Sequence, residues 1–587
     1  MSSSIEIHYR KIRPLNIDAL AKQYTATEYD NTNNYNPYAL SEIQYFNPLY
    51  TDFFVLNDTN YNRVGLNHKY YVDGVSIRSD GDDASPEKTY FVKCSPLLDP
   101  VHYLVGKYEN VKNVRVLPNL TNQSECCQKI LNKNNASYVD GFFSYLSSQL
   151  KYKHNMLNAV DFYGSYLAIQ KVFKANITDD IDYLHQSNYF NENIGKGFVI
   201  SCDGANDKFD DFTGIGSRAN KRRLVLEDVI DASEMDIDVV DVSDMSAGNA
   251  ETEDILCEYE KSDNEDDSSV SDESDNDTAS KSSSNEGHNE GDDEGEDESE
   301  NEDESEDESE DEGEDEGEDE EESEDSTESE SEAYAYIDNF PTNLIFLEKC
   351  DGTLDRLFME NDVNEQLGSA YMMQIIMSLI AFQKAFHFTH NDLHTNNIMY
   401  INTDIEFLYY KYDNRFYKVP TYGKIFKLID FGRAIYRFKN RIYCSDSFAP
   451  KGDAHSQYNT EPYFNEKKPR VEPNLSFDLC RLGTSIYDFV IENEDDPRDD
   501  FQETIYRWCL DDNGKNIMYR RDGEERYPGF KLYKMIARNV HSHTPQNQLK
   551  YPIFEQFMLP VSEAMKLDEQ EVRRYGLNLD LVEREYV

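Results

Sequence analysis

Three short motifs in the second half of the chain carry residue types that commonly do chemistry. The first, at residues 390–397, reads HNDLHTNN and places an aspartate and an asparagine five positions apart. The second is an apolar run that ends in DFG at residues 430–432, and the third, DLCRLG, covers residues 478–483. Carboxylate and carboxamide oxygens can accept protons or bind a hard cation such as Mg²⁺. Because each motif alone is too short to be specific, their order along the chain is the informative feature.

The expected secondary structure would hold these motifs on loops between regular elements. Residues 364–387 carry one apolar stripe at helical spacing, which predicts a long helix just before the first motif. Two β-like runs, 398–402 and 425–430, connect the first motif to the second and flank a polar, tyrosine-rich insertion at 403–422. From Phe477 onward the pattern is largely helical. This succession of helix, loop, strand, strand, DFG and helix is unlikely to arise by chance.

The constellation resembles the catalytic lobe of protein kinases. The resemblance implies that Asp392 is the catalytic base and that Asn397 and Asp430 bind Mg²⁺ beside the phosphates of ATP. It also implies that His390 packs near the phenylalanine of the DFG motif. Asp478 would then accept hydrogen bonds from the backbone N–H groups of the first motif.

The same resemblance places the phosphate-binding lysine in the first half of the chain. Lys93, at the end of a predicted strand, would bind the α- and β-phosphates. The predicted helix 137–150 offers Asp140 as the acidic partner of this lysine, where the family has glutamate. A glycine-rich phosphate loop should precede Lys93, yet only Gly65 and Gly74 stand there.

A rival register would use Gly195 and Gly197 as the phosphate loop, with Lys208 or Lys221 as the lysine. That register leaves no room for the regulatory helix before the acidic tract described below. The order of the elements therefore favours Lys93.

The last strand of the N-lobe and the hinge are expected within residues 343–354. Here Leu347 would be the gatekeeper, and the backbone groups of Glu348 to Cys350 would bind adenine.

Two departures from the family pattern follow the hinge. Asn391 replaces the arginine that commonly binds the phosphate of a modified activation loop, so we do not expect loop phosphorylation to be the switch. The insertion 403–422 also lengthens the segment between the base and the DFG motif.

Other kinds of site are compatible with part of this pattern. His387, His390 and His394 have a spacing that could form a metal site on one helix face, but that would leave the DFG and DLCRLG motifs unexplained. The Asp-Leu-His sequence at 392–394 also occurs in haspin-like kinases and in small-molecule kinases of the aminoglycoside type. The glycine of the DFG motif and the later Asp478 motif favour the protein-kinase branch.

Charge is concentrated in one tract. The chain has 587 residues and a formal net charge of −59, and residues 251–332 contain 44 acidic residues against two lysines. Such a tract cannot bury enough apolar surface to fold, so it should be a disordered insertion, with docking of basic proteins as a functional alternative. The negative charge argues against nucleic-acid binding. No signal peptide or membrane-spanning segment is evident, which predicts an intracellular protein, in a host cytoplasm or a virion.

We therefore expect an α+β, bilobal protein-kinase-like fold with a long disordered acidic insertion in the N-lobe. The segments YVDGFFSYLSSQL, DFYGSYL, HNDLHTNN and FDLCRLG look like the divergent serine/threonine kinase-like proteins of large nucleocytoplasmic DNA viruses. The implied activity is transfer of the γ-phosphate of Mg·ATP to protein Ser or Thr hydroxyls. A pseudokinase scaffold that binds basic partners, or a small-molecule kinase, are the alternatives. The expected division is an N-terminal extension (1–44), an N-lobe and hinge (45–350) interrupted by the acidic tract (251–332), a C-lobe (351–560) and a C-terminal tail (561–587).

Overall fold

The computed structural model describes residues 4–12, 14–73, 75–79, 89–202, 332–491, 498–520 and 523–586. Within these ranges the fold is mixed α+β with several small sheets, which confirms the α+β class expected from the sequence. The acidic insertion predicted at 251–332 lies outside the described residues except for its last residue. Gly74, Lys208 and Lys221 also lie outside them.

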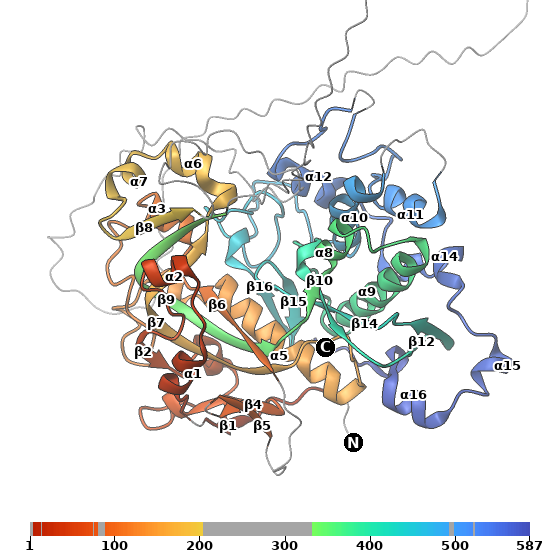
Figure 1. Ribbon diagram of the computed structural model, residues 1–587, viewed down its shortest axis with the longest axis horizontal. Coiled ribbons are helices and arrows are strands. Elements are labelled where there is room, and N and C mark those ends of the chain that lie inside the picture. Colours follow the sequence, from red (N-terminus) through yellow and green to blue (C-terminus); the bar gives the residue numbers. More distant parts are fainter. Residues whose placement is uncertain are drawn as a thin grey trace, which may run out of the picture. The chain divides into compact units, whose positions relative to one another are not determined.

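The largest sheet contains five strands in the order β2-β7-β9-β6, with β8 also paired to β9 (Figure 1). Strand β9 was expected from residue 343, but it begins ten residues earlier because it pairs antiparallel with β6, β7 and β8 along its length. Its register sets Lys93 opposite Ile345. The strands are β2 (Leu40–Gln44), β6 (Tyr90–Pro96), β7 (Phe162–Asn176), β8 (Phe198–Cys202) and β9 (Ala333–Glu348).

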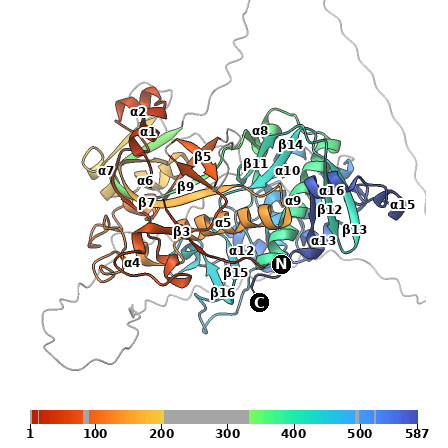
Figure 2. The ribbon, with the colours of Figure 1, turned by 90° about the horizontal axis from the view of Figure 1, so that it is seen from below.

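Helix α5 (Ala136–His154) lies beside this sheet (Figure 2). Its side chains are almost continuously buried from Ser137 to Leu150, and the Asn343 side chain of β9 donates a hydrogen bond of 3.2 Å to the Ser137 carbonyl. Phe143 of α5 packs against Phe382, Phe386 and Phe388, which precede the first motif, and against the phenylalanine of DFG. The aromatic cluster therefore joins α5 to the segments that carry the motifs.

Helix α9 (Glu365–Phe386) confirms the long helix expected before the first motif. It leads into the loop 390–397, which is followed by strand β11 (Ile398–Asn402). Strand β11 pairs antiparallel with β14 (Lys424–Leu428), and Ile398 faces Leu428. Because the first motif enters β11 and the DFG motif leaves β14 at this end, antiparallel pairing brings the two motifs together.

The insertion 403–422 is an ordered hairpin of β12 (Phe407–Tyr412) and β13 (Arg415–Pro420). Strand β17 (Gly576–Asn578), from the expected C-terminal tail, pairs parallel with β12. The sequence did not predict this sheet, because its third strand comes from a segment more than 150 residues further along the chain.

Both ends of the described chain belong to the same folded unit. Strand β1 (Tyr9–Lys11) pairs with β3 (Val64–Leu66), and the backbone N–H of Ile5 donates to the Glu585 carboxylate at 2.8 Å. The expected extension 1–44 and tail 561–587 therefore pack on the rest of the fold. Among the described residues, no helix is both long and apolar enough to cross a membrane.

The C-terminal helices begin with α10 (Phe477–Val490), which carries the DLCRLG motif and confirms the helix expected there. It packs on α11 (Asp500–Trp508) and contacts α12 (Phe530–Asn539). Gly483 permits the close approach of α11, since a Cβ there would lie 2.9 Å from Trp508 Cβ.

Candidate active site

Lys93 of β6 is held between two carboxylates. Its Nζ lies 2.7 Å from Asp140 Oδ2 of α5 and 2.8 Å from Asp430 Oδ1 of the DFG motif. Burial alone would lower the pKa of Lys93, but the two carboxylates raise it, so the lysine stays charged. The expected pairing of Lys93 with Asp140 is confirmed, although aspartate is shorter than glutamate.

Asp140 also binds the backbone of the DFG segment. Its side chain is almost fully buried, and its Oδ1 accepts a hydrogen bond of 2.9 Å from the Phe431 N–H. Burial raises the pKa of this carboxyl, whereas Lys93 opposes that shift. One aspartate thus fixes the lysine and the DFG backbone at the same time.

Asp430 occupies an unusual backbone conformation, with φ of 61°. This left-handed region is uncommon for residues other than glycine and often marks functional sites. Its carboxylate is 45% exposed, and although burial of the remainder opposes ionisation, the Lys93 ammonium lowers the pKa. An ionised, accessible carboxylate beside Lys93 can bind a cation.

Asp478 binds the backbone of the first motif, as expected. The Asp478 carboxylate accepts hydrogen bonds of 2.9 Å from the N–H groups of both His390 and Asn391. The His390 ring lies 5.6 Å from the Phe431 ring, and its Nε2 is 2.9 Å from the Ile429 carbonyl. The predicted packing of this histidine near the DFG phenylalanine is therefore confirmed.

Asp392 faces several polar groups. Its Oδ1 accepts a hydrogen bond of 2.8 Å from the Tyr533 hydroxyl of α12, and its Oδ2 lies 3.9 Å from Arg433 Nε. Arg481 Nε in turn donates to the Tyr533 oxygen at 2.9 Å. Burial opposes ionisation of Asp392, but Arg433, His394 and the other neighbours hold its pKa well below the usual range. Asp392 is therefore an ionised carboxylate at neutral pH.

Sequence reasoning missed three of the groups around Asp392, namely Arg433, Arg481 and Tyr533. Arg433 directly follows the DFG motif and Arg481 lies inside DLCRLG, so position could have indicated them. Tyr533 lies in no motif, and no sequence signal identifies it. His394, two positions after Asp392, is neutral at pH 7, because burial lowers its pKa to about 4.

Asn397 is oriented by its amide nitrogen. Nδ2 donates to the Asp392 carbonyl at 2.9 Å and lies 3.0 Å from His394 Nε2. Asn397 and Asp430 each carry an oxygen of the kind that Mg²⁺ prefers. No group of three or more His, Cys, Asp and Glu side chains suited to a metal occurs in the described part of the chain.

These residues open onto one cavity of about 690 Å³. Its lining includes Lys93, Asp140, Asp392, Asp430 and Tyr533. Asn397, the expected second Mg²⁺ ligand, is not among the lining residues, whereas its neighbour Asn396 is. The structure thus brings together residues that lie more than 300 positions apart in sequence.

The three expected hinge residues do not line this cavity. Leu347 is buried at the end of β9, and Cys350 is half-buried, with a thiol whose pKa burial raises to about 11. The backbone N–H of Glu348 already donates to the Asp161 carbonyl at 2.9 Å. It is therefore not the group that would bind adenine in this conformation.

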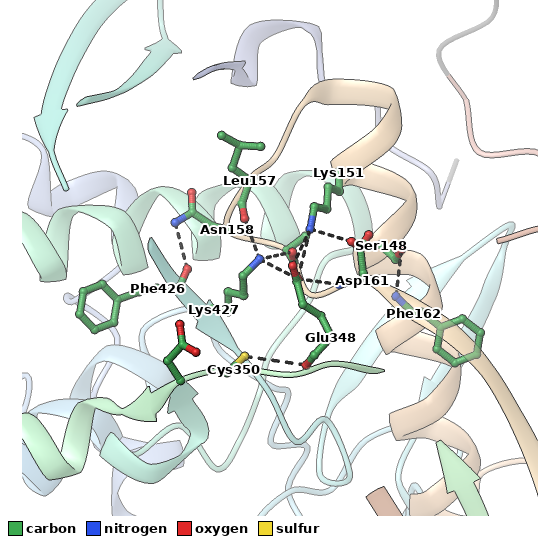
Figure 3. Close-up of polar contacts among 12 residues, drawn as sticks. Ser148, Lys151, Leu157, Asn158, Asp161, Phe162, Glu348, Cys350, Phe426 and Lys427 are labelled. Carbon is green, nitrogen blue, oxygen red and sulfur yellow. Dashed lines mark hydrogen bonds and ion pairs between the residues drawn. The ribbon is translucent and has the colours of Figure 1, made fainter. Parts of the chain in front are cut away.

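The Glu348 side chain instead belongs to a buried charge cluster (Figure 3). Its Oε2 lies 3.0 Å from Lys427 Nζ and 3.1 Å from Lys151 Nζ, and Lys151 also pairs with Asp161 at 3.1 Å. Lys427 is completely buried and donates to the carbonyls of Leu157 and Ala159 at 3.0 and 2.9 Å. The cluster ties α5, β9 and β14 to the segment 157–161 that precedes β7.

A comparison of the sequence with protein-family models finds no match, and a comparison with curated proteins finds none either.

Proposed function

We propose that the protein is an ATP- and Mg²⁺-dependent kinase with a bilobal protein-kinase-like fold, which transfers the γ-phosphate to Ser or Thr hydroxyls of proteins. The observation that carries the proposal is Lys93, held between Asp140 and Asp430 in the same cavity as Asp392. Phosphoryl transfer depends mainly on positioning and on charge stabilisation, and these side chains supply both.

Each side chain has a distinct task in this proposal. Lys93 binds the α- and β-phosphates, and Asp392 accepts the hydroxyl proton, for which its lowered pKa keeps it ionised. Asp430 and Asn397 hold Mg²⁺, which neutralises charge on the phosphates when bound. Asp478 keeps the loop of Asp392 in place through its two backbone hydrogen bonds.

The direct test is transfer of labelled γ-phosphate from ATP by the full chain to a generic basic protein or to itself. Lys93→Met should lower the rate at least about a hundredfold, since it removes both the phosphate contact and the carboxylate pairs. Lys174→Met is the matched control, because Lys174 is also a strand lysine that pairs with a buried aspartate, Asp30, at 3.0 Å. Equal rates for the wild type and Lys93→Met would reject the proposed role of Lys93.

The same preparation distinguishes the two alternatives. Stabilisation by Mg·ATP in a thermal-shift titration, without any transfer, would favour a pseudokinase scaffold. If Mg·ATP neither stabilises the protein nor supports transfer, the proposed nucleotide site would be rejected. Transfer to an added small alcohol or aminoglycoside, but to no protein, would favour a small-molecule kinase.

A further inference from the structure

Asp446 connects the segment after the DFG motif to the start of α5. It follows the hairpin of β15 (Ile435–Phe438) and β16 (Arg441–Cys444), and its side chain is buried. Its Oδ2 lies 2.7 Å from Lys129 Nζ of α4 (Gln128–Leu131), and its Oδ1 accepts the Ala136 N–H at 3.0 Å. Its own backbone N–H donates to the Asn134 carbonyl at 2.7 Å.

These bonds place a negative charge at the N-terminus of α5. The first turn of α5 contains no acidic residue of its own, so Asp446 supplies from a distant segment the charge that a helix N-terminus favours. Burial raises the pKa of this carboxyl, and Lys129 and the Ala136 N–H oppose that shift. The contact therefore combines an ion pair with a hydrogen bond to the helix backbone.

Helix α5 transmits this contact to the site. Ala136 lies one turn before Asp140, which pairs with Lys93 at 2.7 Å and accepts the Phe431 N–H. A shift of the first turn of α5 would move Asp140 and break both contacts. In protein kinases the lysine–acid pair is controlled by the position of this helix and by loop phosphorylation.

We propose that Asp446 is a positioning residue that holds α5, and through Asp140 also Lys93, in the phosphate-binding arrangement without any modification of the chain. This inference deepens the proposed function and rests on it. It also accounts for Asn391, since a permanent carboxylate makes an arginine for a loop phosphate unnecessary.

The test uses the full chain with two readouts. Asp446→Ala removes the ion pair and the helix contact, whereas Asp446→Asn removes the charge but keeps an acceptor for the Ala136 N–H. Asp446→Ala should speed hydrogen exchange at the amides of residues 136–140 by about tenfold or more and weaken Mg·ATP binding to a similar degree. Asp446→Asn should have the same effects, but smaller. The control Asp30→Asn, which breaks a buried aspartate–lysine pair between α2 (Glu28–Thr32) and β7, should change neither readout.

The two readouts separate the inference from the proposed function. Exchange at 136–140 within about twofold of wild type in Asp446→Ala would overturn the inference, whether or not ATP binds. If Asp446→Ala does not fold, hydrogen exchange at residues 136–140 is compared with wild type in Asp446→Asn and Lys129→Met instead. Faster exchange in the variants, in a protein that never binds Mg·ATP, would support the role of Asp446 in holding α5 but reject the kinase function.

Discussion

Replacing Glu348 with glutamine should destabilise the protein strongly, although glutamine has the same shape. Glu348 neutralises Lys427, whose side chain is completely buried, and Lys151. In the variant, Lys151 keeps Asp161 at 3.1 Å, so Lys427 alone loses its counter-charge. Breaking a buried pair by removing one partner typically costs about 3–5 kcal/mol.

The loss of stability in Glu348→Gln has an upper limit. Lys427 can escape the unpaired charge by losing its proton, and at pH 7 a lysine with an ordinary pKa of about 10.4 needs about 4.6 kcal/mol for that. Burial already lowers the pKa of Lys427, so the real value is smaller. We expect a loss of about 3–4 kcal/mol in the free energy of unfolding.

Urea unfolding of the full chain measures this loss. The control is Glu360→Gln, which breaks an exposed pair with Arg356 one helical turn away and should change stability little. The double variant Glu348→Gln/Lys427→Met should recover part of the loss, since no unpaired buried charge remains. A cost below about 1 kcal/mol in Glu348→Gln would refute the argument that this cluster depends on the glutamate charge.

The stability difference between the wild type and Glu348→Gln should also depend on pH. Burial would raise the pKa of Glu348, but Lys427 and Lys151 together lower it well below the value of a free glutamate. A carboxyl with a lowered pKa stabilises the fold above its unfolded pKa of about 4.3, and this contribution is lost as the pH falls. The stability difference between wild type and Glu348→Gln should therefore shrink below about pH 4. A difference that stays constant down to pH 3 would contradict the direction of the shift.

Three further substitutions test the site. Tyr533→Phe removes a hydrogen bond that lowers the pKa of Asp392, so the acidic limb of the pH profile of kcat/KM should move to higher pH; an unmoved limb would contradict this role. Asp478→Asn keeps one acceptor for two N–H donors, so it should lower the free energy of unfolding in urea by about 2 kcal/mol and also slow phosphoryl transfer. An unchanged urea midpoint would contradict the proposed support of the loop by Asp478. Asp140→Asn weakens the ion pair with Lys93 and should reduce the affinity for Mg·ATP, measured by calorimetry, about tenfold. An affinity equal to that of the wild type would show that the Lys93–Asp140 pair is dispensable for nucleotide binding.

The sequence predicted the parts of the site that depend on motif order. The juxtaposition of Lys93, Asp140 and Asp430, the support of the loop by Asp478 and the packing of His390 on Phe431 all follow from the expected succession of elements. These contacts are fixed by neighbouring strands and helices whose hydrophobic patterns are visible locally.

Contacts with partners distant in sequence could not be predicted. Tyr533 reaches Asp392 from a helix about 140 positions away, and nothing in its local sequence indicates that contact. The ordered hairpin in 403–422 depends on β17 near the other end of the chain. The expected hinge role of Glu348 concerned its backbone, at the end of β9, whereas the pairing of its side chain with two lysines on other elements had no local sequence signal. In each case tertiary pairing decides a role that local pattern leaves open.

In the proposed function, Asp392 performs the chemistry of phosphoryl transfer while other residues bind the nucleotide. Asp392→Asn should lower single-turnover transfer from labelled Mg·ATP at least about a hundredfold and leave Mg·ATP stabilisation in the thermal-shift assay unchanged. Asp404→Asn, at an exposed position in the same half of the chain, serves as the control. Transfer by Asp392→Asn at the wild-type rate would contradict the account.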